Sequence, residues 1–161
     1  MALVSIYTVG RLNYPYDHPA SREFLQVGNE VYRQATKQGL IEAFSSEGVP
    51  FPEEIVKGKG PGILTLSVWR GLQSLYHFTY SGKHKQALRD RSRWIEPYPE
   101  KHLSYVVWWT EMVMDVSWEE ASRRYEHYVQ HGSTPFAFDF KRAFDEKGET
   151  FLISDNGGFK E

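Results

Sequence analysis

The stretch "TLSVWRGLQSLYHFTYSGKH", Thr65–His84, decides the fold, because it passes directly from a strand pattern to a helix pattern. The strand is predicted over Ile63–Trp69 and has two distinct faces. One face carries Leu64, Leu66 and Val68, and the other carries Thr65, Ser67 and Trp69. The next residues place His77, Tyr80 and His84 at helical spacing. Either one helix continues to His84, or Ser81-Gly82 ends one helix and starts another.

The segments before this stretch predict a strand, a helix, a second strand and a long loop. The first strand is predicted over Leu3–Val9, and Pro19 suits the first turn of the helix. This helix is expected to end at Gly39. Its apolar face consists of Phe24, Val27, Val31 and Ala35. A second strand follows over Leu40–Ser45, and Ser46–Gly62 is rich in proline and glycine, which predicts a loop that could serve as a lid.

The segments after it predict a basic helix, a fourth strand and a further helix. The basic helix runs to Trp94, and the fourth strand is predicted over His102–Thr110, apolar on both faces. Ser117 with Glu120 is the signature of a capping box, which predicts a helix with one apolar side. That side consists of Trp118, Ala121, Tyr125 and Tyr128. The segment 135–144, "PFAFDFKRAF", is expected to be a short strand or edge segment, and the residues through 156–158 are expected to fray.

This order of elements predicts an α+β fold of the ferredoxin-like type, a split βαβ arrangement with an antiparallel sheet and an extra C-terminal helix. In such a fold the helices lie on one face of the sheet and the other face is open. An open apolar face carrying residues such as Val106 and Trp108 needs cover, and face-to-face dimerisation would supply it. We expect a single domain over residues 1–145 and a tail over 146–161.

The bulk properties exclude several classes of protein. The chain has 161 residues, the length of one domain, and its net charge of −2 gives no electrostatic case for binding nucleic acid or an anionic membrane. It has no cysteine, which excludes thiolate catalysis and cysteine-ligated metal sites. The N-terminus "MALVSIYTVGR" shows no pattern of a signal peptide or membrane span, so a cytoplasmic location is expected. Aromatic residues make up 16% of the chain, which favours either a bulky core or a cavity for a flat ligand.

Several motifs resemble the dimeric α/β-barrel superfamily, typified by antibiotic-biosynthesis-type monooxygenases. The motifs are "YTVGRL", "TLSVWRG", "YSGKH", "RSRWIEP", "HLSYVVWW" and "STPFAFDFKRAF". Up to about Phe144 the chain is similar to a functionally undefined family within that superfamily. The resemblance implies a dimeric α/β barrel in which the strand ends in Trp69 and the helix carries His77. The break at Ser81-Gly82 is followed by His84, and the kink lies at the mouth of a pocket.

The candidate catalytic residues are His84, Tyr80 and His77. An imidazole beside a phenol can perform general acid–base chemistry, because the ordinary pKa of histidine lies near neutral pH. The alternative is that His84 bonds the backbone at the break and that Tyr80 belongs to the core. The candidate substrate-binding residues are Tyr7, Arg11, Trp69, Arg91, Trp94, His102 and Trp108. Of these, Arg91 could hold a carboxylate or enolate.

No cofactor and no metal are expected. The spacing of His77, His84 and His102 matches no standard set of metal ligands, and the chain lacks the glycine-rich motifs of nucleotide-binding proteins. The sequence therefore predicts a cofactor-independent isomerase, cyclase or lyase acting on a hydrophobic cyclic or polyketide- or terpenoid-like metabolite. One alternative is a cofactor-free monooxygenase of the antibiotic-biosynthesis type. Another is a non-enzymatic ligand- or haem-binding stress-type dimer. The expected partners are a hydrophobic small molecule and a second copy of the chain.

Overall fold

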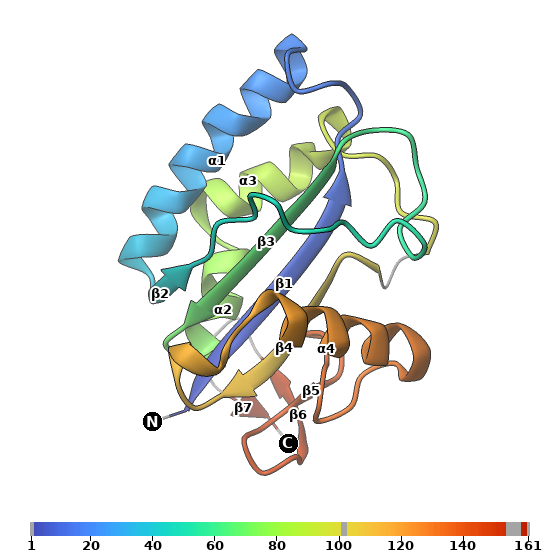
Figure 1. Ribbon diagram of the computed structural model, residues 1–161. Coiled ribbons are helices and arrows are strands. Elements are labelled where there is room, and N and C mark those ends of the chain that lie inside the picture. Colours follow the sequence, from blue (N-terminus) through green and yellow to red (C-terminus); the bar gives the residue numbers. More distant parts are fainter. Residues whose placement is uncertain (1, 101–102, 154–158, 161) are drawn as a thin grey trace.

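The protein is built around a four-stranded antiparallel sheet (Figure 1). The computed structural model describes residues 2–100, 103–153 and 159–160. The strand order is β2-β3-β1-β4. These strands are β1 (Leu3–Arg11), β2 (Leu40–Ala43), β3 (Gly62–Trp69) and β4 (Tyr105–Thr110). The predicted alternation is confirmed, because Tyr7 of β1 pairs with Leu66 of β3 and Val106 of β4 on one face.

Four α-helices accompany the sheet. They are α1 (Pro19–Lys37), α2 (Leu72–Thr79), α3 (Gly82–Asp90) and α4 (Trp118–His131). Short 3₁₀ turns over Arg91–Arg93 and Val113–Asp115 follow α3 and β4. The two predicted starts are confirmed: Pro19 lies at the beginning of α1, and the Ser117 hydroxyl accepts a hydrogen bond from the Glu120 amide at 3.1 Å. None of the described helices combines the length and the apolar composition needed to cross a membrane.

The connections make two crossovers, each of which passes one strand of the sheet. Both β2 and β1 are antiparallel to β3, so α1 links two parallel strands with β3 between them. In the same way, α2 and α3 link β3 to β4, which lies on the other side of β1. This α+β arrangement is compatible with a ferredoxin-like fold.

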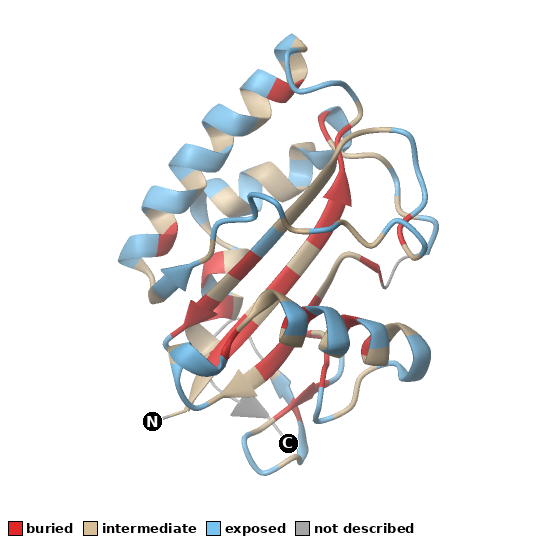
Figure 2. Ribbon diagram, viewed as in Figure 1, coloured by how far each residue is buried: buried red, intermediate tan, exposed pale blue. Residues whose placement is uncertain are grey.

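Two apolar cores lie on opposite faces of the sheet, and this corrects the expectation of an open face. The first core lies under α1 and α2 and contains Val4, Trp69 and Val107. The second core contains Val106 and Trp108, and it is covered by α4 and by part of the loop after β2 (Figure 2). The helix buries Ala121, Tyr125 and Tyr128 there. The cover that we expected from a second copy of the chain comes, for these residues, from the same chain.

The chain after α4 returns to the sheet and then forms a small sheet of its own. Phe138 extends the edge of β4 by exchanging two backbone hydrogen bonds with Val107, at 2.7 and 2.9 Å. The small sheet has the order β5-β6-β7, with β5 (Ala143–Phe144), β6 (Thr150–Ile153) and β7 (Phe159–Lys160). The boundary expected between residues 145 and 146 falls inside the β5–β6 hairpin, and Phe151 belongs to the first core. The expected fraying at 156–158 lies outside the described residues.

The helix predicted after β3 is interrupted at Ser81-Gly82, so the second of the two alternatives is correct. Gly82 has φ +52°, a left-handed conformation that favours glycine. Gln34 of α1 holds the break from the side. Its amide group donates to the Ser81 carbonyl at 3.0 Å, and its carbonyl accepts from the His84 amide at 2.9 Å. The interruption is therefore part of the packing between α1 and the α2–α3 pair.

Candidate functional site

His84 lies at the start of α3 with its ring against the end of α2. Its Nδ1–H donates to the Thr79 carbonyl at 2.8 Å, and its ring lies 4.7 Å from that of Phe78. Since a carbonyl can only accept, the proton sits on Nδ1 of the neutral ring. Burial lowers the pKa of His84, and this outweighs the opposing effect of the bond to Thr79. This is the geometry of the structural alternative named above, and a catalytic role for His84 stays a prediction.

The burial of His84 predicts that the folded chain becomes less stable as the pH decreases. In the unfolded chain the imidazole titrates near its ordinary pKa of 6.5, and burial lowers that pKa in the folded chain. Below pH 6.5 the unfolded state therefore binds a proton that the folded state does not. The free energy of unfolding should fall with decreasing pH, with a slope of up to about 1.4 kcal/mol per pH unit. Urea unfolding between pH 7.5 and about 5 should show a steeper decline for the wild type than for His84→Asn. Parallel curves would contradict this account.

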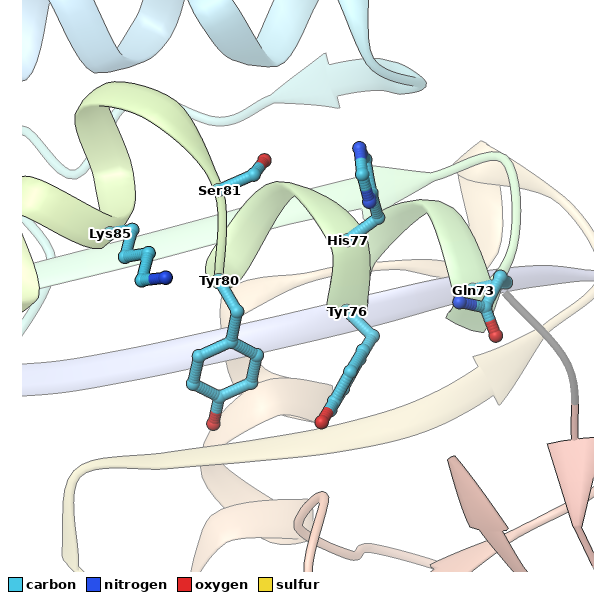
Figure 3. A pocket seen from close by; sticks show the side chains of 6 residues that line it. All are labelled: Gln73, Tyr76, His77, Tyr80, Ser81 and Lys85. Atoms are coloured by element: carbon cyan, nitrogen blue, oxygen red, sulfur yellow. The ribbon is translucent and has the colours of Figure 1, made fainter. Parts of the chain in front are cut away.

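Tyr80 and His77 both line a shallow groove along α2, with a volume of about 460 Å³. Figure 3 shows the rings of Tyr76 and Tyr80 on one side of α2 and His77 on the opposite side. The ring of Tyr80 lies 4.9 Å from that of Tyr76 and 6.1 Å from that of Phe140. Tyr80 is exposed. The alternative, which placed Tyr80 in the core, is therefore wrong on this point. His77 and Tyr80 thus share a groove but do not face each other.

The predicted substrate-binding residues are distributed over the whole molecule. Trp69 and Trp108 belong to the two separate cores. Trp94 is buried against α1, where its indole nitrogen donates to the Glu23 carboxylate at 2.9 Å. Arg91 is exposed, and His102 lies outside the described residues. None of the four described residues among these five lines either the groove along α2 or a cavity beside α4.

Arg11 is buried at the end of β1, where it holds the long loop after β2. Its guanidinium donates to the carbonyls of Val56 at 3.0 Å and Gly60 at 2.8 Å, and it forms an ion pair with Glu53. The same group lies 4.6 Å from the centre of the Phe51 ring. Arg11 thus anchors the loop to strand β1. The part of the predicted lid near residues 56–60 is therefore held against the sheet.

A cavity larger than the groove along α2 lies between this loop and α4, over the face of the sheet that carries the second core. Its volume is about 850 Å³. One wall is formed by residues 48–55, which we call the cavity segment. The other wall is a stripe along α4, which consists of Trp118, Glu119, Ser122, Arg123 and Glu126. These positions recur at helical spacing beside the stripe that α4 buries on the sheet, so one helix serves both the core and the cavity.

Tyr7 lies at the base of this cavity and, among the predicted site residues that the structure describes, is the one that lines it. The side chain is only 3% exposed, and its ring contacts those of Tyr125 at 5.4 Å and Trp118 at 6.2 Å. Burial, with a smaller contribution from the charge of Glu126, raises the pKa of Tyr7 to about 12. No hydrogen bond of its hydroxyl is found among the described residues. Tyr7 therefore offers the cavity a protonated phenol that can donate a hydrogen bond.

Sequence analysis missed most of the residues of this cavity. The cavity segment was predicted only as part of a loop that could serve as a lid, and of α4 only the apolar side was assigned. The polar positions Glu119, Ser122 and Glu126 recur at steps of three and four, and this spacing was the available signal. Within the described ranges, no group of three or more histidine, aspartate or glutamate side chains is arranged to hold a metal ion.

The fold and the cavity define an α+β protein with helices on both faces of one antiparallel sheet and a ligand-sized cavity over one face. Residues 3–152 match the model of a family described as "Domain of unknown function (DUF3291)". Because the match spans nearly the whole chain, the chain belongs to this family. Comparisons with curated proteins and with solved structures gave no match.

Proposed function

We propose that the chain binds a hydrophobic small molecule in the cavity between residues 48–55 and α4, and that Tyr7 donates a proton or hydrogen bond to it there. The observation that carries the proposal is Tyr7 itself, which lines a cavity of about 850 Å³ although it is only 3% exposed. A cavity of this size suits a metabolite of moderate size. With a pKa raised to about 12, the phenol is a donor and not a base at neutral pH.

The reaction class that fits these residues is a cofactor-independent isomerisation, cyclisation or lysis. Such reactions are accelerated by a shaped, partly dry surface and one well-placed proton donor. A hydrophobic cyclic or polyketide- or terpenoid-like substrate and a cytoplasmic location belong to this proposal. The described residues that line the cavity include no histidine, which favours this class over a monooxygenase that uses a histidine base.

Assembly as the dimeric α/β barrel that the motifs resemble is also part of the proposal. The ferredoxin-compatible strand order β2-β3-β1-β4 supports it. Native mass spectrometry of the purified chain tests the dimer and the small-molecule ligand together, because it measures the oligomeric state and retains a bound small molecule. A monomer would contradict the barrel.

The site itself is tested by filling it. Ser122 lies on the cavity stripe of α4, and Gln130 is an exposed residue on the same helix outside the cavity. Ser122→Trp should abolish the binding of a neutral apolar dye such as Nile red, and Gln130→Trp should leave it unchanged. Equal binding by both variants would place the ligand elsewhere.

Tyr7→Phe separates an enzyme from a binding protein. The substitution removes only the hydroxyl, so turnover of a metabolite consumed by the wild type should fall about 100-fold or more while its affinity changes little. The measurement is the rate of consumption in an extract, followed by mass spectrometry, with His84→Asn as the comparison. A rate that falls with His84→Asn and not with Tyr7→Phe would show that the catalytic site lies at the break between α2 and α3 and not in this cavity. Binding without consumption by the wild type would identify a binding protein.

A further inference from the structure

The two walls of the cavity carry an excess of negative charge. Glu53 and Glu54 belong to the cavity segment, and Glu119 and Glu126 belong to the facing stripe of α4. Of these four, Glu53 is already paired with Arg11. The cation among the lining residues is Arg123, and it is already paired with the Glu120 carboxylate of the preceding turn. A ligand between the walls therefore meets carboxylates from both sides.

The surfaces between these carboxylates are aromatic. Trp118 lies on the α4 wall, and its indole N–H donates to the Ser45 carbonyl at 3.0 Å, which fixes the orientation of the ring. Tyr7 lies at the base in edge contact with it, with ring centres 6.2 Å apart. Aromatic faces beside carboxylates are the combination that recognises organic ammonium groups, through cation–π attraction and ion pairing.

Tyr7 supplies a polar group at the base of the cavity, in addition to the carboxylates and the aromatic surfaces. Its side chain is nearly buried and lines the cavity, and no hydrogen bond of its hydroxyl is found among the described residues. A phenol can accept a hydrogen bond from an ammonium group as well as donate one. The proximity of Glu126 is strong enough to contribute to the raised pKa of this phenol, so the negative field of the wall reaches the base of the cavity.

We propose that the ligand of this cavity is an organic cation, an amine whose ammonium group lies between Glu126 and Tyr7 and whose apolar body lies against Trp118 and the cavity segment. This inference rests on the proposed function, because it assumes that the cavity is a ligand site. It narrows the ligand from a hydrophobic molecule to one that carries a positive charge.

Three probes that share an indole ring and differ in charge test it. They are tryptamine, which is an ammonium ion at neutral pH, tryptophol, which is neutral, and indole-3-acetate, which is an anion. The measurement is a titration of the full-length protein followed through the Trp118 indole N–H resonance, which the spectrum of Trp118→Phe identifies. We expect tryptamine to bind about fivefold more tightly than tryptophol and indole-3-acetate to bind most weakly. The advantage of tryptamine should shrink as salt is added.

Glu126→Gln provides the matched variant. It should weaken tryptamine binding about three- to fivefold and leave tryptophol binding unchanged. Glu146→Gln makes the same change at an exposed position outside the cavity, and it should alter neither. Equal binding of the three probes, or tightest binding of indole-3-acetate, would contradict the proposal that the ligand is a cation. The cavity would remain a ligand site. If none of the probes moves the Trp118 resonance at millimolar concentration, the cavity itself fails as the site, and the proposed function fails with it.

Discussion

The Gly60→Ala variant is expected to lose about 3 kcal/mol of its free energy of unfolding. A Cβ atom at Gly60 would lie 1.6 Å from the Leu12 carbonyl oxygen, which is backbone and cannot rotate away. The loop must therefore move as a whole. Two hydrogen bonds would be weakened by that movement, from the Gly60 amide to Glu96 at 2.6 Å and from the Leu12 amide to the Pro61 carbonyl at 2.9 Å.

The measurement is chemical denaturation of the purified variant, with Gly48→Ala as the control. Gly48 lies in the same loop at φ +76°, with no atom within 4 Å of the position of its Cβ. This control therefore reports the backbone conformation alone, for which we expect a loss of about 1 kcal/mol. Losses of equal size in the two variants would show that the contact with Leu12 does not hold the loop.

Arg11→Met is expected to cost about 3 kcal/mol as well, and for a different reason. The Arg11 side chain is 7% exposed and supplies donors to the carbonyls of Val56 and Gly60. Methionine fills a similar volume but leaves both carbonyls without a donor, at about 1–3 kcal/mol each, in part recovered by relaxation or water. Because the cavity segment directly precedes Val56, the variant should also bind Nile red less tightly.

Glu53→Gln shows which contact of Arg11 matters. The Glu53 side chain is 69% exposed, so its ion pair with Arg11 is largely solvated and should contribute less than about 1 kcal/mol. We expect urea denaturation to give a large loss for Arg11→Met and a small one for Glu53→Gln. If Glu53→Gln is as destabilised as Arg11→Met, the ion pair and not the pair of carbonyls anchors the loop.

The sheet and the helices could be predicted because their signals are local. Alternation assigned β3 to within one residue, since Leu66 and Val68 occupy one buried face. A cap assigned the start of α4, because the Ser117 hydroxyl satisfies an amide of the first turn. The extent of β4 was predicted too long at its start, where the strand begins at Tyr105. Strand ends depend on which backbone groups find partners across the sheet, and one strand alone carries no such information.

The position of α4 could not be predicted, and the cavity depends on it. The pattern of Ala121, Tyr125 and Tyr128 shows that one side of this helix is buried, but it does not show against which face of the sheet. Residues 48–55 and the α4 stripe are far apart in the sequence and meet only through the fold. Tyr7 was identified because its place on β1 follows from strand alternation alone.

His84 illustrates the opposite case, in which local chemistry suggested a catalytic site but did not show how the residue packs. The residue types and their spacing were those of an acid–base pair. The sequence could not show the bond from Nδ1 to the Thr79 carbonyl or the contact of Gln34 from α1, because both depend on three-dimensional placement.

The strand order β2-β3-β1-β4 has a consequence for how the protein is made. The central strand β1 is the first to be synthesised, yet one of its two neighbours, β4, ends only at Thr110. At about 5–20 residues per second, the ribosome takes roughly 5–20 s to deliver that second neighbour, and α4 comes later still. During this time the side chains of β1 that the second core will bury have no cover. The nascent chain is therefore most open to aggregation and to chaperones before α4 emerges, and the cavity can form only after that helix has been made.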